Sequence, residues 1–276
     1  MPDYDGPERR TLAGLFDDAT AQRGERAPFV ELGIATCFSF LKGASDAVDL
    51  ALTAHRLGYD ALGVADVNSL AGVVRIHSEA KTLGLRPVIG CRIETVAEQG
   101  KAGHCFLAYP IDRAAYGRLS RLLSKGKMTT REGGWQTKGE CHITLAMLAA
   151  HSEGVRLILV PPEHLESIED DLPQLTQMLP TLQYIAACYH YRGNDIARIN
   201  RLDVLAKTHG LSILATNDVL YHAAHRRPLQ DVMTAIRHKT TVANAGLLLH
   251  PNAERHLKSP QEMARLFARW PHAIKA

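Results

Sequence analysis

Seven apolar stretches of strand length, separated mostly by stretches of helical length, constrain the fold of this chain more than any other feature. Each apolar stretch ends at a polar or turn residue, as a strand does where it enters a loop. Strands that alternate with helices indicate a parallel β/α architecture. The seven predicted strands cover residues 29–34, 61–65, 87–94, 104–109, 155–160, 182–189 and 212–216.

Two of the intervening stretches carry clear signals of helix termination. Residues 46–57 and 68–83 have the apolar period of a helix, and they are followed by Gly58 and Gly84. Glycine is the residue that a helix C-terminus prefers, since it adopts the left-handed conformation easily. With 276 residues, of which 46% are apolar, the chain is long enough for one β/α barrel.

Composition excludes some classes of protein. No apolar run reaches the length of a membrane span, and the first 28 residues lack the apolar core of a signal peptide. We therefore expect a cytoplasmic protein. The five cysteines are widely spread and form no CxxC pair, so we expect reduced thiols without a chemical role.

A basic segment follows the fourth predicted strand. If residues 112–125 are helical, Arg118, Arg121 and Lys125 lie on one face, opposite Tyr116, Leu119 and Leu123. Two interpretations remain open: an ordinary solvated face on the outside of a barrel, or a patch that contacts the phosphates of DNA.

Polar residues follow several of the predicted strands, where a β/α barrel places its active site. Asp66 follows the second strand, His190 the sixth, and Asp218 and His222 the seventh. Carboxylate and imidazole groups are common ligands of divalent metals, so these four residues are candidates for a metal site. The alternative is structural, because Asp66 suits a helix N-cap and Asp218 suits a turn.

Four long segments resemble the polymerase-and-histidinol-phosphatase (PHP) domain of bacterial C-family DNA polymerases, in particular the error-prone ImuC type. The resemblance implies an α/β fold, a distorted seven-stranded TIM-like β/α barrel. The segments are FVELGIATCFSFLKGAS (29–45), ALGVADVNSLAGVVRIHSEAKTLGLRPVIGCRIE (61–94), ILATNDVLYHAAHRRPLQDVMTAIR (213–237) and HLKSPQEMARLF (256–267).

The chain departs from this family where the family binds metal. Of the ligand positions that can be aligned, only Asp66 and Asp218 keep a ligand. A cation at Arg92 would occupy part of the space of a metal and pair with Asp66 or Asp218. The positions without a suitable ligand are Gly33, Ala35, Lys42, Val67, Arg92 and Leu220.

The resemblance implies three parts: an N-terminal extension (1–28), a PHP-like barrel (29–225) and a helical segment (226–276) that leads towards an absent palm domain. We expect a degenerate, metal-free structural and interaction module of an error-prone polymerase in translesion synthesis and DNA repair. Without a palm this chain should not polymerise DNA, and it needs no cofactor, whereas the palm of a full-length protein would use Mg²⁺.

The alternative is a metal-dependent phosphoesterase, either a 3′–5′ exonuclease or a phosphatase, that uses Asp66, His190, Asp218 and His222. Expected partners are the remainder of the polymerase and, by resemblance, an accessory translesion protein and a sliding clamp. DNA is a further candidate partner, and no membrane partner is expected.

Overall fold

The structure is a computed structural model that describes residues 28–97, 103–128, 136–137 and 139–276. The predicted N-terminal extension, apart from residue 28, lies outside these ranges. The seven predicted strands are confirmed, and they form one curled sheet in the order β1-β2-β3-β4-β5-β6-β7. The strands are β1 (Glu31–Ile34), β2 (Ala61–Val67), β3 (Arg86–Glu94), β4 (Cys105–Pro110), β5 (Val155–Val160), β6 (Leu182–Ala187) and β7 (Ser212–Ala215).

The predicted parallel arrangement is present in four of the six neighbouring strand pairs, and β4 departs from it. This strand is antiparallel to both β3 and β5, while the other neighbouring pairs are parallel. β3 and β4 are joined as a hairpin, with Thr95 N donating to His104 O at 2.9 Å just beyond the paired strands. A parallel pair needs a crossover of a dozen or more residues, and the β3–β4 connection is too short for one.

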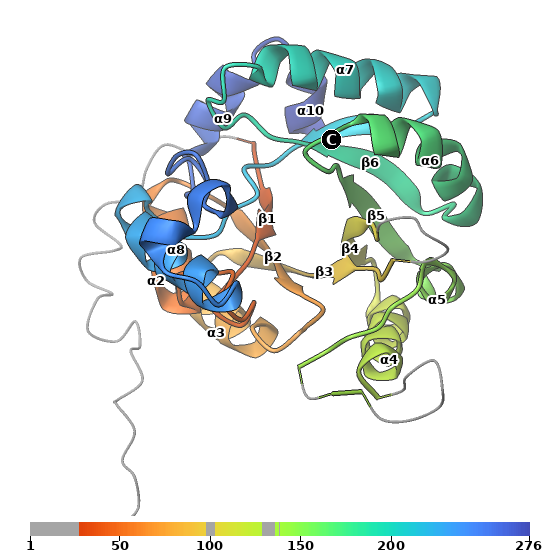
Figure 1. Cartoon of the computed structure of the whole chain (residues 1–276), viewed down its shortest axis with the longest axis horizontal. Helices are drawn as coiled ribbons and strands as arrows, with labels where there is room; N and C mark the ends of the chain where they lie inside the picture. Colours follow the sequence, from red (N-terminus) through yellow and green to blue (C-terminus); the bar gives the residue numbers. More distant parts are fainter. Residues whose placement is uncertain (1–27, 98–102, 129–135, 138) are drawn as a thin grey trace, which may run out of the picture.

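Helices cover the outside of the curled sheet (Figure 1). The structure confirms the helix predicted for 46–57, whereas the one predicted for 68–83 begins later, at Val73. Asn68 cannot belong to it, because its backbone is left-handed with φ of 47°. Gly58 and Gly84 both have positive φ, as predicted for helix C-termini. The helices up to β7 are α2 (Ala47–Arg56), α3 (Val73–Thr82), α4 (Arg113–Met128), α5 (Leu145–His151), α6 (Glu166–Met178) and α7 (Asp195–Thr208).

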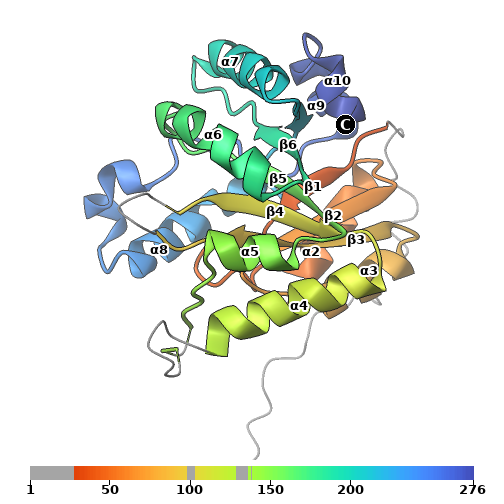
Figure 2. The ribbon, with the colours of Figure 1, turned by 90° about the vertical axis from the view of Figure 1, so that its right-hand side faces the viewer.

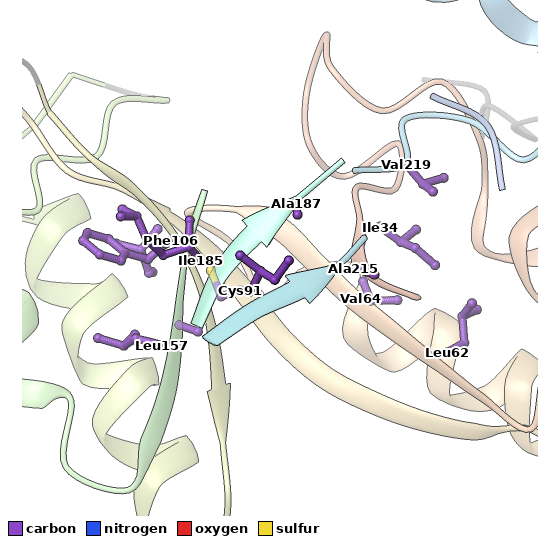
Figure 3. Close-up of a cluster of buried hydrophobic side chains, with 14 of the residues drawn as sticks. Ile34, Leu62, Val64, Cys91, Phe106, Leu157, Ile185, Ala187, Ala215 and Val219 are labelled. Carbon is purple, nitrogen blue, oxygen red and sulfur yellow. The ribbon is translucent and has the colours of Figure 1, made fainter. Parts of the chain in front are cut away.

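Alternation along the strands creates two apolar layers. Side chains such as Val64, Leu157 and Ile185 point outward and form the main core beneath the helices, as Figure 3 shows. Their neighbours, including Ala65 and Ile158, point to the inner side of the curled sheet and form a second cluster. Because successive residues of a strand face opposite sides, this alternation also fixes the direction of every polar side chain near the strand ends.

Glu31 links the first and last strands. Its buried carboxylate accepts hydrogen bonds from Gly33 N at 2.7 Å, from Asn217 N at 2.7 Å and from the hydroxyl of Thr216. Ala35 N also donates to Val219 O at 2.9 Å. In the part of the chain that the structure describes, side-chain and loop hydrogen bonds therefore close the curve between β1 and β7, where no strand ladder is formed.

The residues after β7 form short helices that pack back on the barrel. Phe267 and Trp270 lie in the main core, so this segment shares its apolar interior. None of the helices within the described ranges is long and apolar enough to cross a membrane. The elements are η2 (Ala224–Arg226), α8 (Arg227–Arg237), η3 (Val242–Asn244), η4 (Gly246–Leu248), α9 (Pro260–Leu266) and α10 (Pro271–Lys275). Figure 2 shows α9 and α10 beside α7, on a different side of the sheet from α8.

Candidate functional site

Asp218 and two arginines form a buried ion cluster just beyond the end of β7. The Asp218 carboxylate is bonded through Oδ1 to Arg92 Nη2 and through Oδ2 to Arg255 Nη2. Arg255 also donates from Nε to the Asp218 carbonyl at 2.9 Å. The three side chains are only 10–15% exposed. One carboxylate is thus bound on both oxygens by guanidinium groups from distant parts of the chain.

The charges in this cluster perturb each other strongly. Burial alone would raise the pKa of Asp218, but the guanidiniums of Arg255 and Arg92 hold that pKa well below its usual range. Asp218 itself has a left-handed backbone, with φ of 47°, a conformation in which aspartate is tolerated better than most residues. The cluster therefore keeps Asp218 ionised over the whole range of neutral and mildly acidic pH.

Asp66 lies outside this cluster, because it points to the other side of the sheet. It shares the outward direction of Leu62 and Val64, whereas Arg92 is in register with Val67, the inward-facing neighbour of Asp66. Of the two partners proposed for Arg92, the structure therefore gives Asp218.

The Asp66 carboxylate shapes the loop after β1 instead. Its Oδ1 accepts from Thr36 N at 2.8 Å and from Ser39 Oγ at 2.6 Å, and its Oδ2 accepts from Thr36 Oγ1 at 2.9 Å. Burial raises the pKa of Asp66, and these hydrogen bonds oppose that effect. All the contacts of this carboxylate are thus those of a structural residue within the fold.

The two candidate histidines also have protein partners. His190 Nε2 lies 2.9 Å from Asn217 O, to which it donates, and burial together with the charge of Arg255 lowers the pKa of His190 to about 4. His222 Nδ1 lies 2.8 Å from Ser45 Oγ. Among the described residues, no three His, Cys, Asp or Glu side chains form a group that could hold a metal ion. His190 and Asp218 line one cavity, but Asp66 and His222 are bonded elsewhere, so the four predicted candidates do not form one site.

The positions that lack ligands are filled in ways that suit a packed protein. A Cβ atom at Gly33 would lie 2.5 Å from Thr216 Oγ1, so a larger side chain would not fit there without rearrangement. Ala35 and Leu220 pack in a small apolar cluster, and Val67 is half-buried. Lys42 Nζ forms an ion pair with Glu94 Oε1 at 2.5 Å.

A cavity of about 270 Å³ adjoins the ion cluster. It is lined on the cluster side by Asp218, Arg255, His190 and His250. His250 Nε2 accepts a hydrogen bond from Arg255 Nη1 at 3.0 Å, which places its own proton on Nδ1. Burial and the charge of Arg255 lower the pKa of His250 to about 4, so both histidines are neutral at pH 7.

Sequence reasoning missed three residues of this region: Arg255, His250 and Glu31. Arg255 lies 37 residues from Asp218, and Glu31 lies 185 residues from Thr216. No motif marks any of them, and the contacts exist only after the barrel has closed.

The basic helix α4 is formed as predicted, but its faces differ in detail. Leu119 and Leu123 are buried, whereas Tyr116 is exposed rather than packed. Arg118 donates from Nε to Glu153 O at 2.7 Å and lies 3.8 Å from the Glu153 carboxylate. Arg121 and Lys125 are exposed. Part of the predicted DNA-binding charge is therefore engaged within the protein.

Comparison with known proteins agrees with this fold. The chain is 46% identical over 248 residues to the error-prone DNA polymerase of Caulobacter vibrioides, an alignment that covers 90% of this chain and 22% of that polymerase. It is 43% identical over 254 residues to the error-prone DNA polymerase of Brucella abortus, with 90% of this chain and 23% of that protein covered. The chain spans less than a quarter of the length of these relatives.

A solved structure shares the architecture. It is that of a protein from Bifidobacterium adolescentis predicted to be a metal-dependent phosphoesterase, with a TM-score of 0.51, 16% identity, and coverage of 71% of this chain and 88% of that one. This likeness concerns the fold alone. Residues 31–174 match the model of the PHP domain. The chain therefore belongs to the PHP domain family.

Proposed function

We propose that this chain is the amino-terminal PHP domain of an error-prone DNA polymerase and that its former metal site has become a structural ion cluster. The single observation that carries the proposal is the pairing of Asp218 with both Arg92 and Arg255. The error-prone polymerases that the chain resembles supply the context in which a domain without catalysis of its own would act.

The physical argument concerns what a divalent ion requires. Such an ion gives up part of its hydration shell only for several anionic or imidazole ligands. Here the aligned ligand positions supply one carboxylate that faces the cluster, and two guanidiniums already bind both of its oxygens. Two fixed positive charges would also repel an incoming cation. The residues present do not fit a metal ion, and this supports a domain that is metal-free.

In this proposal the ion cluster takes over a structural role at the place where other members of the family bind metal. Arg92 comes from β3, Asp218 from the turn after β7, and Arg255 from the segment after α8. Their ion pairs fasten the C-terminal segment to the curled sheet. In a longer polymerase this segment leads onward to the rest of the chain, so the cluster would help to fix how the domain is joined to the palm, where Mg²⁺ would be bound.

This role implies a cytoplasmic location. It also implies DNA, a sliding clamp and an accessory translesion protein as partners, and we propose these from the resemblance to error-prone polymerases. A phosphoesterase with a reduced ligand set is the competing function. It would need Asp66, His190, Asp218 and His222 to converge, but these residues have separate hydrogen-bond partners.

Metal content and hydrolysis distinguish the two functions. We expect the purified protein, after exposure to Zn²⁺ or Mn²⁺ and desalting, to hold much less than one ion per chain and to hydrolyse neither single-stranded DNA nor p-nitrophenyl phosphate. About two or more stoichiometric ions, together with chelator-sensitive hydrolysis that disappears in Asp218→Ala, would overturn the proposal. Asp203→Ala, an aspartate on α7 outside the cluster, is the matched control for loss of hydrolysis.

A further inference from the structure

Helix α8 packs on the barrel through Met233, Ala235 and two buried polar side chains, and it leaves three large apolar side chains exposed. Gln230 and Thr234 are each 1% exposed, and Gln230 Nε2 donates to Thr234 Oγ1 at 2.9 Å. Leu229, Val232 and Ile236 are 42%, 44% and 56% exposed. With about 100° between successive residues, these three lie within a sector of about 60° on the side away from Gln230 and Thr234. The apolar sector is therefore not the one that attaches α8 to the barrel.

Further exposed apolar side chains lie in the turns that follow α8. Val242, Leu247 and Leu248 are exposed, and Leu247 is fully exposed. They belong to η3 and η4, and η3 lies against α8. Figure 1 shows these blue turns together with α8 at the edge of the molecule, outside the curled sheet. We call this surface the α8 face, defined by Leu229, Val232, Ile236, Val242, Leu247 and Leu248.

Such an exposed apolar surface is unusual for a helix that makes all its contacts within its own domain. A surface helix places its apolar stripe against the core and its polar side chains in water. A contiguous apolar patch left in water marks an interaction site more often than an isolated exposed leucine does. His238 and Lys239 are exposed just beyond the end of α8, whereas Arg237 donates from Nη1 to Leu41 O at 3.3 Å. Protein interfaces commonly combine an apolar centre with polar residues around it.

We propose that the α8 face is the docking surface for the part of the polymerase that follows residue 276. This inference rests on the proposed function. The chain spans 22% of the Caulobacter vibrioides polymerase, so most of such a protein would lie outside these 276 residues and would need a surface on this domain. A stable interface buries roughly 800 Å² on each side around an apolar centre.

The location of the C-terminus refines the proposal. The chain ends beside α10, away from α8 in both views (Figures 1 and 2). The residues that directly follow position 276 would therefore leave from another side of the barrel. The occupant of the α8 face is a part of the polymerase that folds further downstream and returns to this side, with apolar side chains at its centre and an acidic residue opposite the exposed Lys239.

Cysteine labelling tests this inference in the protein alone and in the full-length polymerase. Ile236→Cys reports on the α8 face, and Val74→Cys is the matched control, since Val74 is a 79% exposed β-branched residue on α3. Maleimide reaction at each added cysteine is followed by peptide mass. We expect both cysteines to react at similar rates in the 276-residue protein, and Ile236→Cys to react about tenfold or more slowly in the full-length polymerase, because an interface core excludes water and reagents.

Each other outcome overturns the inference. Equal labelling of Ile236→Cys in both proteins would mean that the α8 face stays uncovered. Protection in the 276-residue protein that grows with its concentration would assign the face to a second copy. Protection there at every concentration, removed by deleting residues 1–27, would assign it to the N-terminal residues. Primer extension by the same full-length preparation tests the proposed function separately, so an active polymerase with an unprotected Ile236→Cys rejects only the docking inference.

Discussion

Replacing Arg92 with alanine tests the ion cluster most directly. The change would remove one of the two guanidiniums from Asp218 and leave Oδ1 of a buried carboxylate without its donor. Removing one partner of a buried ion pair costs about 3–5 kcal/mol, and Arg255 remains to neutralise part of the charge. We therefore expect Arg92→Ala to lower the free energy of unfolding by about 2–4 kcal/mol.

Urea denaturation measures this change, with Arg121→Ala as the control. Arg121 is exposed on α4, so its replacement should change the free energy of unfolding by no more than about 0.5 kcal/mol. A double-mutant cycle with Asp218→Asn then separates the pairing of the two side chains from the packing of the arginine stem. If Arg92→Ala were no more destabilising than Arg121→Ala, Arg92 would not replace metal charge in this domain.

The pH dependence of the same difference provides a second test. The pKa of Asp218 is depressed in the folded protein, so its pairing stabilises the fold above the unfolded pKa of about 3.9 and loses this effect as the pH falls towards the folded value. The destabilisation by Arg92→Ala should therefore be largest near neutral pH and shrink in strong acid. A difference that stays constant down to about pH 2 would show that the loss comes from packing rather than from charge.

Three further predictions address the histidines, the barrel closure and DNA. His190 and His250 have folded pKa values of about 4, so unfolding should take up protons, and the free energy of unfolding should fall as the pH falls from about 6.5 towards 4. In urea melts His190→Gln should reduce this pH dependence, whereas the exposed control His77→Gln should not. Glu31→Ala should cost about 2–4 kcal/mol in the same assay, because it leaves three donors at the β1–β7 junction unsatisfied, and a loss below about 0.5 kcal/mol would contradict that role. If α4 contacts phosphates, binding of primer-template DNA should weaken as salt rises, and it should be lost in a folded variant in which Arg118, Arg121 and Lys125 are all replaced by glutamate. Unchanged binding by this variant would show that α4 is an ordinary solvated face.

Much of the fold was predictable because its signals are local. The seven strands and the helix ends at Gly58 and Gly84 follow from apolar runs and from the conformational freedom of glycine. The direction of β4 was not predictable in this way, because parallel and antiparallel strands can have the same apolar sequence pattern. The short link between β3 and β4 was the available signal, since a parallel crossover needs more residues.

The site was less predictable than the fold. The resemblance to the PHP domain indicated Arg92 as a cation at a position where that family has a metal ligand, but its pairing with Asp218 depends on a contact between residues 126 positions apart. Arg255 carried no sequence signal at all. For Asp66 a signal did exist: it continues the outward series of Leu62 and Val64, and alternation along β2 places it on the side of the sheet away from Arg92.

The ion cluster and the α8 face belong to the same stretch of chain. Residues 218–255 begin and end at the cluster, where Asp218 binds Arg255, and the α8 face lies between them. This closed arrangement anchors both ends of the segment to the curled sheet while its middle presents apolar side chains outward. A partner that docks on the α8 face would therefore bind a segment whose two ends are fixed by the ion pair between Asp218 and Arg255. If so, weakening the cluster through Arg92→Ala should loosen α8 as well as the barrel, and the cluster would contribute to docking without touching the partner.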